Sequence, residues 1–148
     1  MKRIFYKIAN PVRNFYRFIF RPETFGVKIL IECDEKFLLI RNSYGVDHWT
    51  FPGGGVKKRE SPENAVKREV NEEVGVEINP VVLGQYFNTR HYTKDTVYCF
   101  YAKVDSFDFR IDESEVTEAK WFSEPEIPQF RSAAVEEVLN LYKSLTNH

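Results

Sequence analysis

Runs of apolar residues predict a β-hairpin followed by several further strands. Residues 24–32 (TFGVKILIE) and 36–41 (KFLLIR) are rich in apolar and β-branched side chains, and Cys33-Asp34-Glu35 separates them as a turn. Short or alternating apolar runs predict the remaining strands: residues 49–51, residues 77–90 with a break near Asn79-Pro80, residues 95–104 and residues 119–122. Residues 105–118 are acidic and are expected to form a loop.

The segment from residue 61 to residue 75 carries the signals of an amphipathic helix. Ser61 is a good N-cap, and Pro62 suits the first helical position. A narrow apolar stripe with the spacing i, i+4 and i+8 consists of Val66, Val70 and Val74. Gly75 stands where a left-handed C-terminal stop is expected, so the helix should end there.

A second amphipathic helix is predicted near the end of the sequence. Its apolar face would consist of Val135, Val138, Leu139, Tyr142 and Leu145. The order of β elements, helix, β elements and helix implies an α+β fold or an α/β/α sandwich. We expect one domain over residues 23–148, preceded by a basic, aromatic and partly helical arm over residues 1–22.

Four glutamates near one arginine are the most informative chemical feature. Glu69, Glu72 and Glu73 follow one another at i, i+3 and i+4, so a helix places them on one face, and Glu60 and Arg68 lie close by in the sequence. Like charges at this spacing repel by roughly a few tenths of a kcal/mol per pair. A divalent cation would convert that repulsion into ligation, which predicts a metal site.

A glycine-rich loop precedes this helix. The sequence from Trp49 to Gly55 reads WTFPGGG, and its glycines permit close approach of the backbone. Such a loop can direct a carbonyl oxygen toward the metal that the helix would bind.

Residues 54–76 resemble the signature of the Nudix (MutT-like) hydrolase family. The pattern is G-x₅-E-x₇-R-E-U-x-E-E-x-G-U, where U is aliphatic, and the chain matches it at every fixed position. The matching residues are Gly54, Glu60, Arg68, Glu69, Val70, Glu72, Glu73, Gly75 and Val76. One departure is Arg59, where many relatives carry glycine. The resemblance implies a mixed β-sheet between helices and hydrolysis of a diphosphate linkage in a nucleoside-diphosphate derivative.

The resemblance also implies roles for individual residues. Glu69, Glu72 and Glu73 would bind Mg²⁺ or Mn²⁺, together with a carbonyl of Gly53 or Gly54. Arg68 would orient a glutamate, for which Glu69 is the first choice. Glu60 would form hydrogen bonds within the motif and contact the metal through water. Two sources remain open for the general base: either Glu69, or a carboxylate of the acidic loop, namely Asp112, Glu113 or Glu115.

Substrate contacts are expected from residues outside the motif. The candidates are Trp49, Phe51, Tyr86 and Arg90, with Asn88, His91 and Phe130 nearby in the sequence. Arg90 could contact phosphate, and an aromatic ring could stack on a base. The alternative for each aromatic residue is packing in the core. Nothing in these residues selects one nucleoside-diphosphate derivative over another.

Composition and charge limit the partners. The net charge is −1, but residues 1–22 contain six basic residues and no acidic one, so the rest of the chain carries −7. That acidic remainder favours a small nucleotide over nucleic acid. The basic arm could contact a membrane surface or nucleic acid, pack on the domain, or build a dimer, which leaves monomer and homodimer open.

The cysteines and the apolar runs bear on location. Cys33 and Cys99 lie in apolar runs without a metal-binding spacing, which favours a reducing cytoplasm and excludes a typical zinc site. We see no signal peptide and no transmembrane run. Two other functions stay open: a nucleotide-binding regulator without catalysis, and an RNA 5′-end pyrophosphohydrolase.

Overall fold

The computed structural model describes residues 23–43, 45–90 and 93–147, without the side chains of residues 89, 90 and 93. The helix and the membrane, nucleic-acid or dimer contacts predicted for residues 1–22 lie outside the described residues. None of the described helices combines the length and apolar character needed to cross a lipid bilayer.

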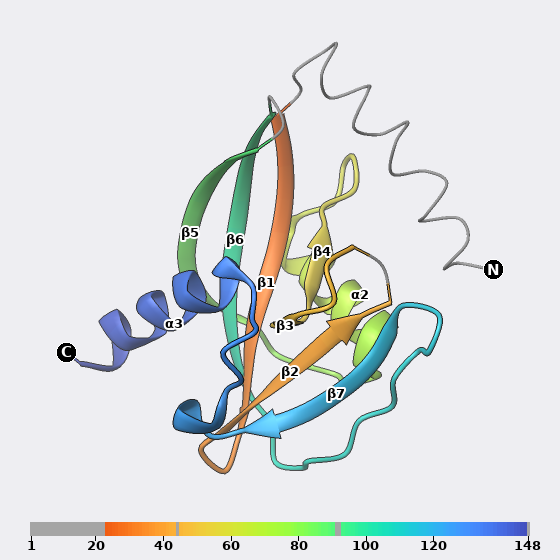
Figure 1. Ribbon diagram of the computed structural model, residues 1–148. Coiled ribbons are helices and arrows are strands. Elements are labelled where there is room, and N and C mark those ends of the chain that lie inside the picture. Colours follow the sequence, from red (N-terminus) through yellow and green to blue (C-terminus); the bar gives the residue numbers. More distant parts are fainter. Residues whose placement is uncertain (1–22, 44, 91–92, 148) are drawn as a thin grey trace.

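Seven strands form one mixed sheet in the described part of the chain (Figure 1). They are β1 (Glu23–Cys33), β2 (Lys36–Asn42), β3 (Trp49–Thr50), β4 (Gly53–Gly55), β5 (Val81–Arg90), β6 (Thr93–Lys103) and β7 (Val116–Phe122). The helices are α2 (Pro62–Val74), a 3₁₀ turn η1 (Glu124–Glu126) and α3 (Ala133–Thr146). The strand order is β3-β2-β1-β6-β5, with β4 paired to β1 and β7 paired to β2. β1 and β6 run parallel, and every other pair is antiparallel.

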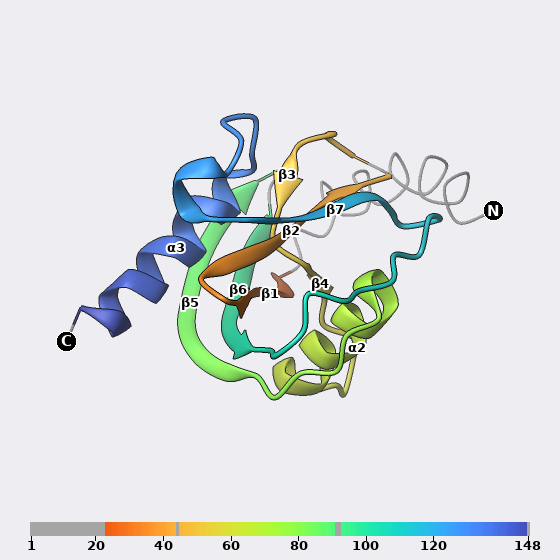
Figure 2. The same ribbon diagram turned by 90° about the horizontal axis from the view of Figure 1, so that it is seen from below.

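Helices α2 and α3 lie on opposite sides of the sheet, which confirms the predicted α/β/α arrangement (Figure 2). Successive residues of β1 face opposite layers because strand side chains alternate. Ile29 packs in the cluster that contains Val66, Val70 and Val74 of α2, whereas Leu30 packs in the cluster that contains Val138 of α3. The two apolar layers hold the helices against a shared set of strands.

The hairpin and the first helix are confirmed, and some boundaries are wrong. Residues 77–80 are not part of β5, which starts at Val81 after the predicted break. β7 starts at Val116, three residues before the predicted position, because Val116 pairs with Asn42 of β2. Leu145 was expected on the apolar face of the last helix but is 54% exposed, since the end of α3 extends past the sheet (Figure 1).

Candidate active site

Local signals at both ends of α2 fix the positions of its glutamates. The Ser61 hydroxyl accepts a hydrogen bond from the Asn64 backbone N–H at 3.1 Å, which satisfies one of the free N–H groups of the first turn. Gly75 has a φ of 64° and donates its N–H to the carbonyls of Val70 and Asn71, so the helix ends as predicted. Between these caps, Val70 and Glu73 are buried on the side of the helix that faces the sheet, and Glu69 precedes Val70.

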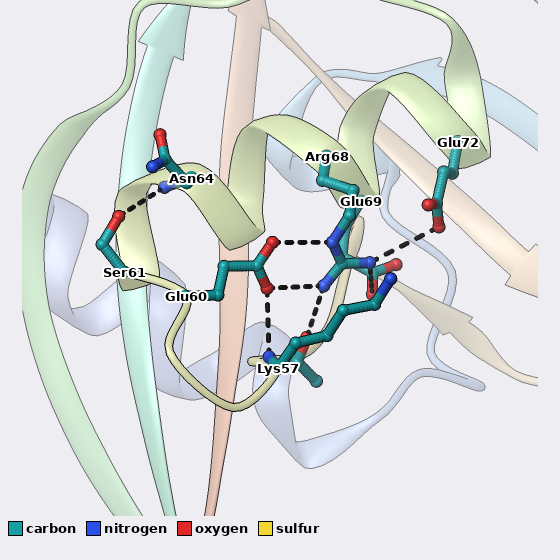
Figure 3. Close-up of polar contacts among 8 residues, drawn as sticks. Lys57, Glu60, Ser61, Asn64, Arg68, Glu69 and Glu72 are labelled. Atoms are coloured by element: carbon teal, nitrogen blue, oxygen red, sulfur yellow. Dashed lines mark hydrogen bonds and ion pairs between the residues drawn. The ribbon is translucent and has the colours of Figure 1, made fainter.

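Arg68 is the centre of a polar network on this helix (Figure 3). Its Nε and Nη2 donate to the two carboxylate oxygens of Glu60 at 2.8 and 2.9 Å, a bidentate contact. Its Nη1 donates to Glu69 Oε1 at 3.0 Å and lies 3.5 Å from Glu72 Oε2. Nη2 also donates to the Gly55 carbonyl at 2.9 Å. The guanidinium therefore ties the glycine loop to α2 and contacts three of the four glutamates.

Glu60 is the main partner of Arg68, and Glu69, the partner that the family resemblance implies, accepts one further hydrogen bond. The Lys57 backbone N–H also donates to Glu60 Oε1, at 3.0 Å. The hydrogen bonds that Arg68 and Lys57 donate lower the pKa of Glu60 to about 2. The hydrogen bonds that Arg68 donates to Glu60 and Glu69 raise the pKa of Arg68 further above its ordinary value. Both carboxylate oxygens of Glu60 are therefore engaged inside the motif.

Glu73 is a carboxyl group in the protein interior. Its side chain is 2% exposed, and Oε1 accepts a hydrogen bond from the Gly53 backbone N–H at 2.9 Å. Burial raises the pKa of Glu73 to about 8, although the nearby positive charge of Lys28 and the Gly53 hydrogen bond act in the opposite direction. Burial likewise raises the pKa of Glu69, and Arg68 opposes that shift. Burial thus favours the neutral form of both carboxyl groups when no cation is bound.

The glycine loop approaches these carboxylates closely. A Cβ atom at Gly54 would overlap the carboxyl group of Glu69, and one at Gly53 would overlap the backbone of Val27. Glycine is therefore required at position 53 by the backbone of β1, whereas a side chain at position 54 would displace the carboxyl group of Glu69.

Lys28 is a site residue that the sequence analysis missed. It lies within β1, and its ammonium group donates to the Phe51 carbonyl at 3.0 Å and to Thr50 Oγ1 at 3.2 Å. Burial lowers the pKa of Lys28, while the charges of Glu73 and Glu69 raise it. A lone lysine inside the apolar run 24–32 is the available signal, but strand alternation alone does not distinguish it from an exposed strand residue.

The acidic loop brings one further carboxylate toward the site. Glu115 is 7% exposed, and its charge raises the pKa of both Glu69 and Glu73. Asp112 Oδ1 accepts hydrogen bonds from the backbone N–H and the hydroxyl of Ser114. Asp112 and Glu113 line an open hollow of about 630 Å³ together with Glu72. Of the three loop candidates for the general base, Glu115 is the one whose charge acts on the buried glutamates.

The carboxylates do not surround a common point in their present rotamers. Glu69 and Glu72 are turned toward Arg68, and Glu73 is turned toward Gly53. Accordingly, no three acidic, histidine or cysteine side chains among the described residues form a ready metal cage. The donor chemistry still suits a hard divalent cation, because the oxygens belong to carboxylates and carbonyls.

A cavity of about 260 Å³ lies beside the start of α3, on the other side of β1 from α2. Its lining includes Lys28, Asn42, His48, Tyr86, Ser132 and Glu137. Asn88 also lines it, so Tyr86 and Asn88 lie where a substrate could bind. Phe130 is 64% exposed, and its ring centre lies 6.0 Å from that of His48.

The other predicted substrate residues lie elsewhere. Phe51 is completely buried in the core below α3, and Trp49 packs edge-on against Phe122 with ring centres 5.0 Å apart. Their side chains serve core packing, the alternative that the sequence had left open. Arg90 is the last residue of β5, but its side chain, like residue His91, is outside the described residues.

Comparisons with known proteins agree with this geometry. Residues 21–142 match the NUDIX domain family. A segment of 57 residues is 49% identical to an RNA pyrophosphohydrolase of Saccharophagus degradans, which covers 38% of this chain and 32% of that protein. The matched segment thus spans about a third of the length of that curated relative.

Two solved structures share the fold over most of the chain. The MutT protein from Methanosarcina mazei has a TM-score of 0.76 at 26% identity, over 87% of this chain and 99% of that one. The MutT NUDIX hydrolase from Burkholderia pseudomallei has a TM-score of 0.74 at 24% identity, over 80% and 97% of the two chains.

Proposed function

The chain belongs to the NUDIX domain family, and from this premise we propose that it is a metal-dependent pyrophosphohydrolase acting on a nucleoside-diphosphate derivative. The observation that carries the proposal is the cluster of Glu69, Glu72 and Glu73 beside Arg68 and the glycine loop. Burial raises the pKa of Glu73 to about 8 in the metal-free protein, and a bound cation would stabilise its ionised form. A pure nucleotide-binding regulator would not need this arrangement.

Mg²⁺ or Mn²⁺ would be held by Glu69, Glu72, Glu73 and a carbonyl oxygen of Gly53 or Gly54. Such an ion neutralises phosphate oxygens and lowers the pKa of a bound water. Glu69 and Glu72 would turn from Arg68 to reach it, while Glu60 would keep Arg68 in place through its bidentate contact. This division explains why one glutamate of the motif is fully hydrogen-bonded within the protein.

Glu115 and Glu69 are the candidates for accepting a proton from the attacking water. Glu115 is buried close enough to influence both Glu69 and Glu73, and burial raises the pKa of Glu69. A carboxylate whose pKa moves toward neutrality is a better general base near pH 7. Lys28 holds the Phe51 carbonyl beside the glycine loop, and its charge opposes the raised pKa of Glu73.

A small nucleotide is the substrate class that the charge of the domain favours. Residues 23–148 carry −7 in total, which opposes an extended polyanion. An RNA 5′ end is the second candidate, because the relative from Saccharophagus degradans is named an RNA pyrophosphohydrolase. The two buried free thiols, Cys33 and Cys99, support the predicted cytoplasmic location.

A substrate panel tests the proposal. The full chain would be incubated with Mg²⁺ and NDP-sugars, ADP-ribose, dNTPs, dinucleoside polyphosphates and 5′-triphosphate RNA, and the products separated by anion exchange. We expect cleavage of a phosphoric anhydride bond in at least one small nucleotide. If only the RNA is cleaved, an RNA 5′ end rather than a small nucleotide is the substrate. If compounds bind and none is cleaved, the result favours a nucleotide-binding regulator.

A further inference from the structure

The chain changes its pairing partner immediately before the glycine loop. β3 pairs with β2, whereas β4 pairs with β1, and Phe51 and Pro52 lie between these two strands and belong to neither. Proline has no backbone N–H, so Pro52 cannot donate a hydrogen bond. The hydrogen bonds that the two carbonyl oxygens accept are therefore important for the path of this crossing (residues 51–52).

Both carbonyl oxygens of the crossing accept a hydrogen bond from β1. The Pro52 oxygen accepts from the Ile29 backbone N–H at 3.0 Å, a contact that does not depend on the side chain at position 29. The Phe51 oxygen accepts from the ammonium group of Lys28 at 3.0 Å. This second contact needs a long side chain with a donor at its end, so it depends on the residue type at position 28.

The ammonium group of Lys28 lies in the protein interior, and its hydrogen bonds join β1 to the segment before α3. It donates to Thr50 Oγ1 at 3.2 Å, and Thr50 Oγ1 also accepts from the Ser132 hydroxyl at 2.9 Å. Burial lowers the pKa of Lys28, and the charges of Glu73 and Glu69 raise it. Enclosing a charged amine is costly, so its place beside the crossing needs an explanation.

The crossing leads directly into the candidate active site. Gly53 follows it, pairs with Lys28 in the register of β1 and β4, and donates its N–H to Glu73 Oε1 at 2.9 Å. A carbonyl oxygen of Gly53 or Gly54 is also the proposed backbone ligand of the metal. Peptide units are planar, so a rotation of the Phe51 carbonyl would also turn the residues that follow. The contact from Lys28 therefore acts on the position of the glycine loop.

We propose that Lys28 is a positioning residue of the active site, which holds the Phe51 carbonyl and thereby keeps the glycine loop against Glu73. The inference rests on the proposed function, because the glycine loop and Glu73 belong to the metal site of that function. Lys28 donates to the residues before the loop, and it lines the cavity on the other side of β1 from α2. Its effect on the reaction is therefore indirect.

Amide hydrogen exchange of the metal-free protein tests this positioning without catalysis. Lys28→Met removes the donor and keeps an unbranched side chain, and NMR in EDTA at pH 6 would follow the N–H groups of Gly53 and Val138. We expect the exchange rate of Gly53, relative to that of Val138 on α3, to rise at least about tenfold in Lys28→Met. At pH 6 Glu73 is neutral, because its pKa is about 8, so the lost lysine charge cannot act through the ionisation of Glu73.

Three further variants complete the comparison. Lys28→Arg retains a long donor, and the adjoining cavity of about 260 Å³ has room for the guanidinium, so this variant should restore slow exchange at Gly53. Lys28→Gln is polar but one atom shorter, so it should behave as Lys28→Met and takes its place if that variant does not fold. Lys103→Met, at the exposed end of β6, is the matched control and should leave the ratio of exchange rates unchanged.

Turnover of the substrate found in the panel measures the effect on the reaction. Lys28→Met should lower kcat by about tenfold or more and change KM by less than about twofold, because Lys28 contacts the protein backbone rather than the nucleotide. Lys28→Arg should recover most of the lost kcat. A residue that served stability alone would leave kcat of the folded variant unchanged.

An unchanged ratio of exchange rates in Lys28→Met, no recovery in Lys28→Arg, or a raised KM with a normal kcat would overturn the inference. Exchange is measured in EDTA, so the two proposals can fail independently. A raised ratio in a chain that hydrolyses nothing would retain the role of Lys28 in holding the loop and remove the proposed function. Hydrolysis at the wild-type kcat in Lys28→Met would do the reverse.

Discussion

Replacing Glu73 by glutamine should stabilise the metal-free protein at neutral pH while removing its activity. In the folded protein the pKa of Glu73 is raised to about 8, whereas a glutamate in an unfolded chain titrates near 4.5. Neutral Glu73 therefore contributes fully to the free energy of unfolding below pH 4.5, and this contribution is lost as the pH rises through 8. Each pH unit in this window corresponds to about 1.4 kcal/mol, so the loss reaches at most about 5 kcal/mol.

The isosteric amide removes this dependence because it does not ionise. Glutamine retains an oxygen that can accept the Gly53 N–H. The free energy of unfolding of Glu73→Gln should equal that of wild type near pH 4.5 and exceed it by up to about 3 kcal/mol at pH 7. Above pH 8 the difference should become constant.

Urea unfolding in EDTA at pH 4.5, 6, 7 and 8.5 measures this difference directly. Glu63→Gln is the matched control, since Glu63 lies on the same helix with its side chain in solvent, and it should change stability by less than about 0.5 kcal/mol at every pH. Mg²⁺ at a hundredfold excess over Kd should raise the free energy of unfolding of wild type by about 2.7 kcal/mol. The same addition should change that of Glu73→Gln little. A difference that does not grow between pH 4.5 and 8 would refute the reasoning.

Other substitutions test the surrounding network. Glu60→Gln should flatten the acid dependence of stability, because the lowered pKa of Glu60, about 2, provides stability above pH 4.5 that is lost as the pH falls through 2. Melting temperatures at pH 3 and pH 6 measure this, and an equal fall in melting temperature in wild type and variant would contradict it. Arg59 has a φ of 67°, so Arg59→Gly should stabilise the fold by roughly 0.5 kcal/mol, while Lys58→Gly should not; a lower melting temperature for Arg59→Gly would contradict this. Glu35 has a φ of 64° in the hairpin turn, and Glu35→Gly should likewise raise the melting temperature without changing activity; a lower melting temperature would count against this description of the turn.

Local signals were sufficient for the elements that contain the site. The caps Ser61 and Gly75 and the valine stripe predicted α2 within a residue at each end, and the turn at Asp34-Glu35 predicted the hairpin. These features depend on backbone conformation and periodicity within a short segment, which the sequence records directly.

Contacts between distant segments could not be predicted as well from the sequence. Lys28 is buried because Thr50, Phe51 and the start of α3 pack around it, and nothing in its own neighbours in the sequence requires this. The bidentate contact of Arg68 with Glu60 depends on how the loop at Lys57 folds back, which the family resemblance did not specify. The parallel pairing of β1 with β6 has a similar origin in tertiary packing.

The role of the motif glutamates is tested most directly by turnover of the substrate found in the panel. Initial rates would be measured for wild type, Glu72→Gln and Glu73→Gln in Mg²⁺, and for wild type in EDTA, with circular dichroism to verify folding. We predict that EDTA abolishes hydrolysis and that each substitution lowers kcat by about two orders of magnitude or more, since each removes a metal ligand. Near-normal rates in both folded variants, or full activity in EDTA, would contradict the account.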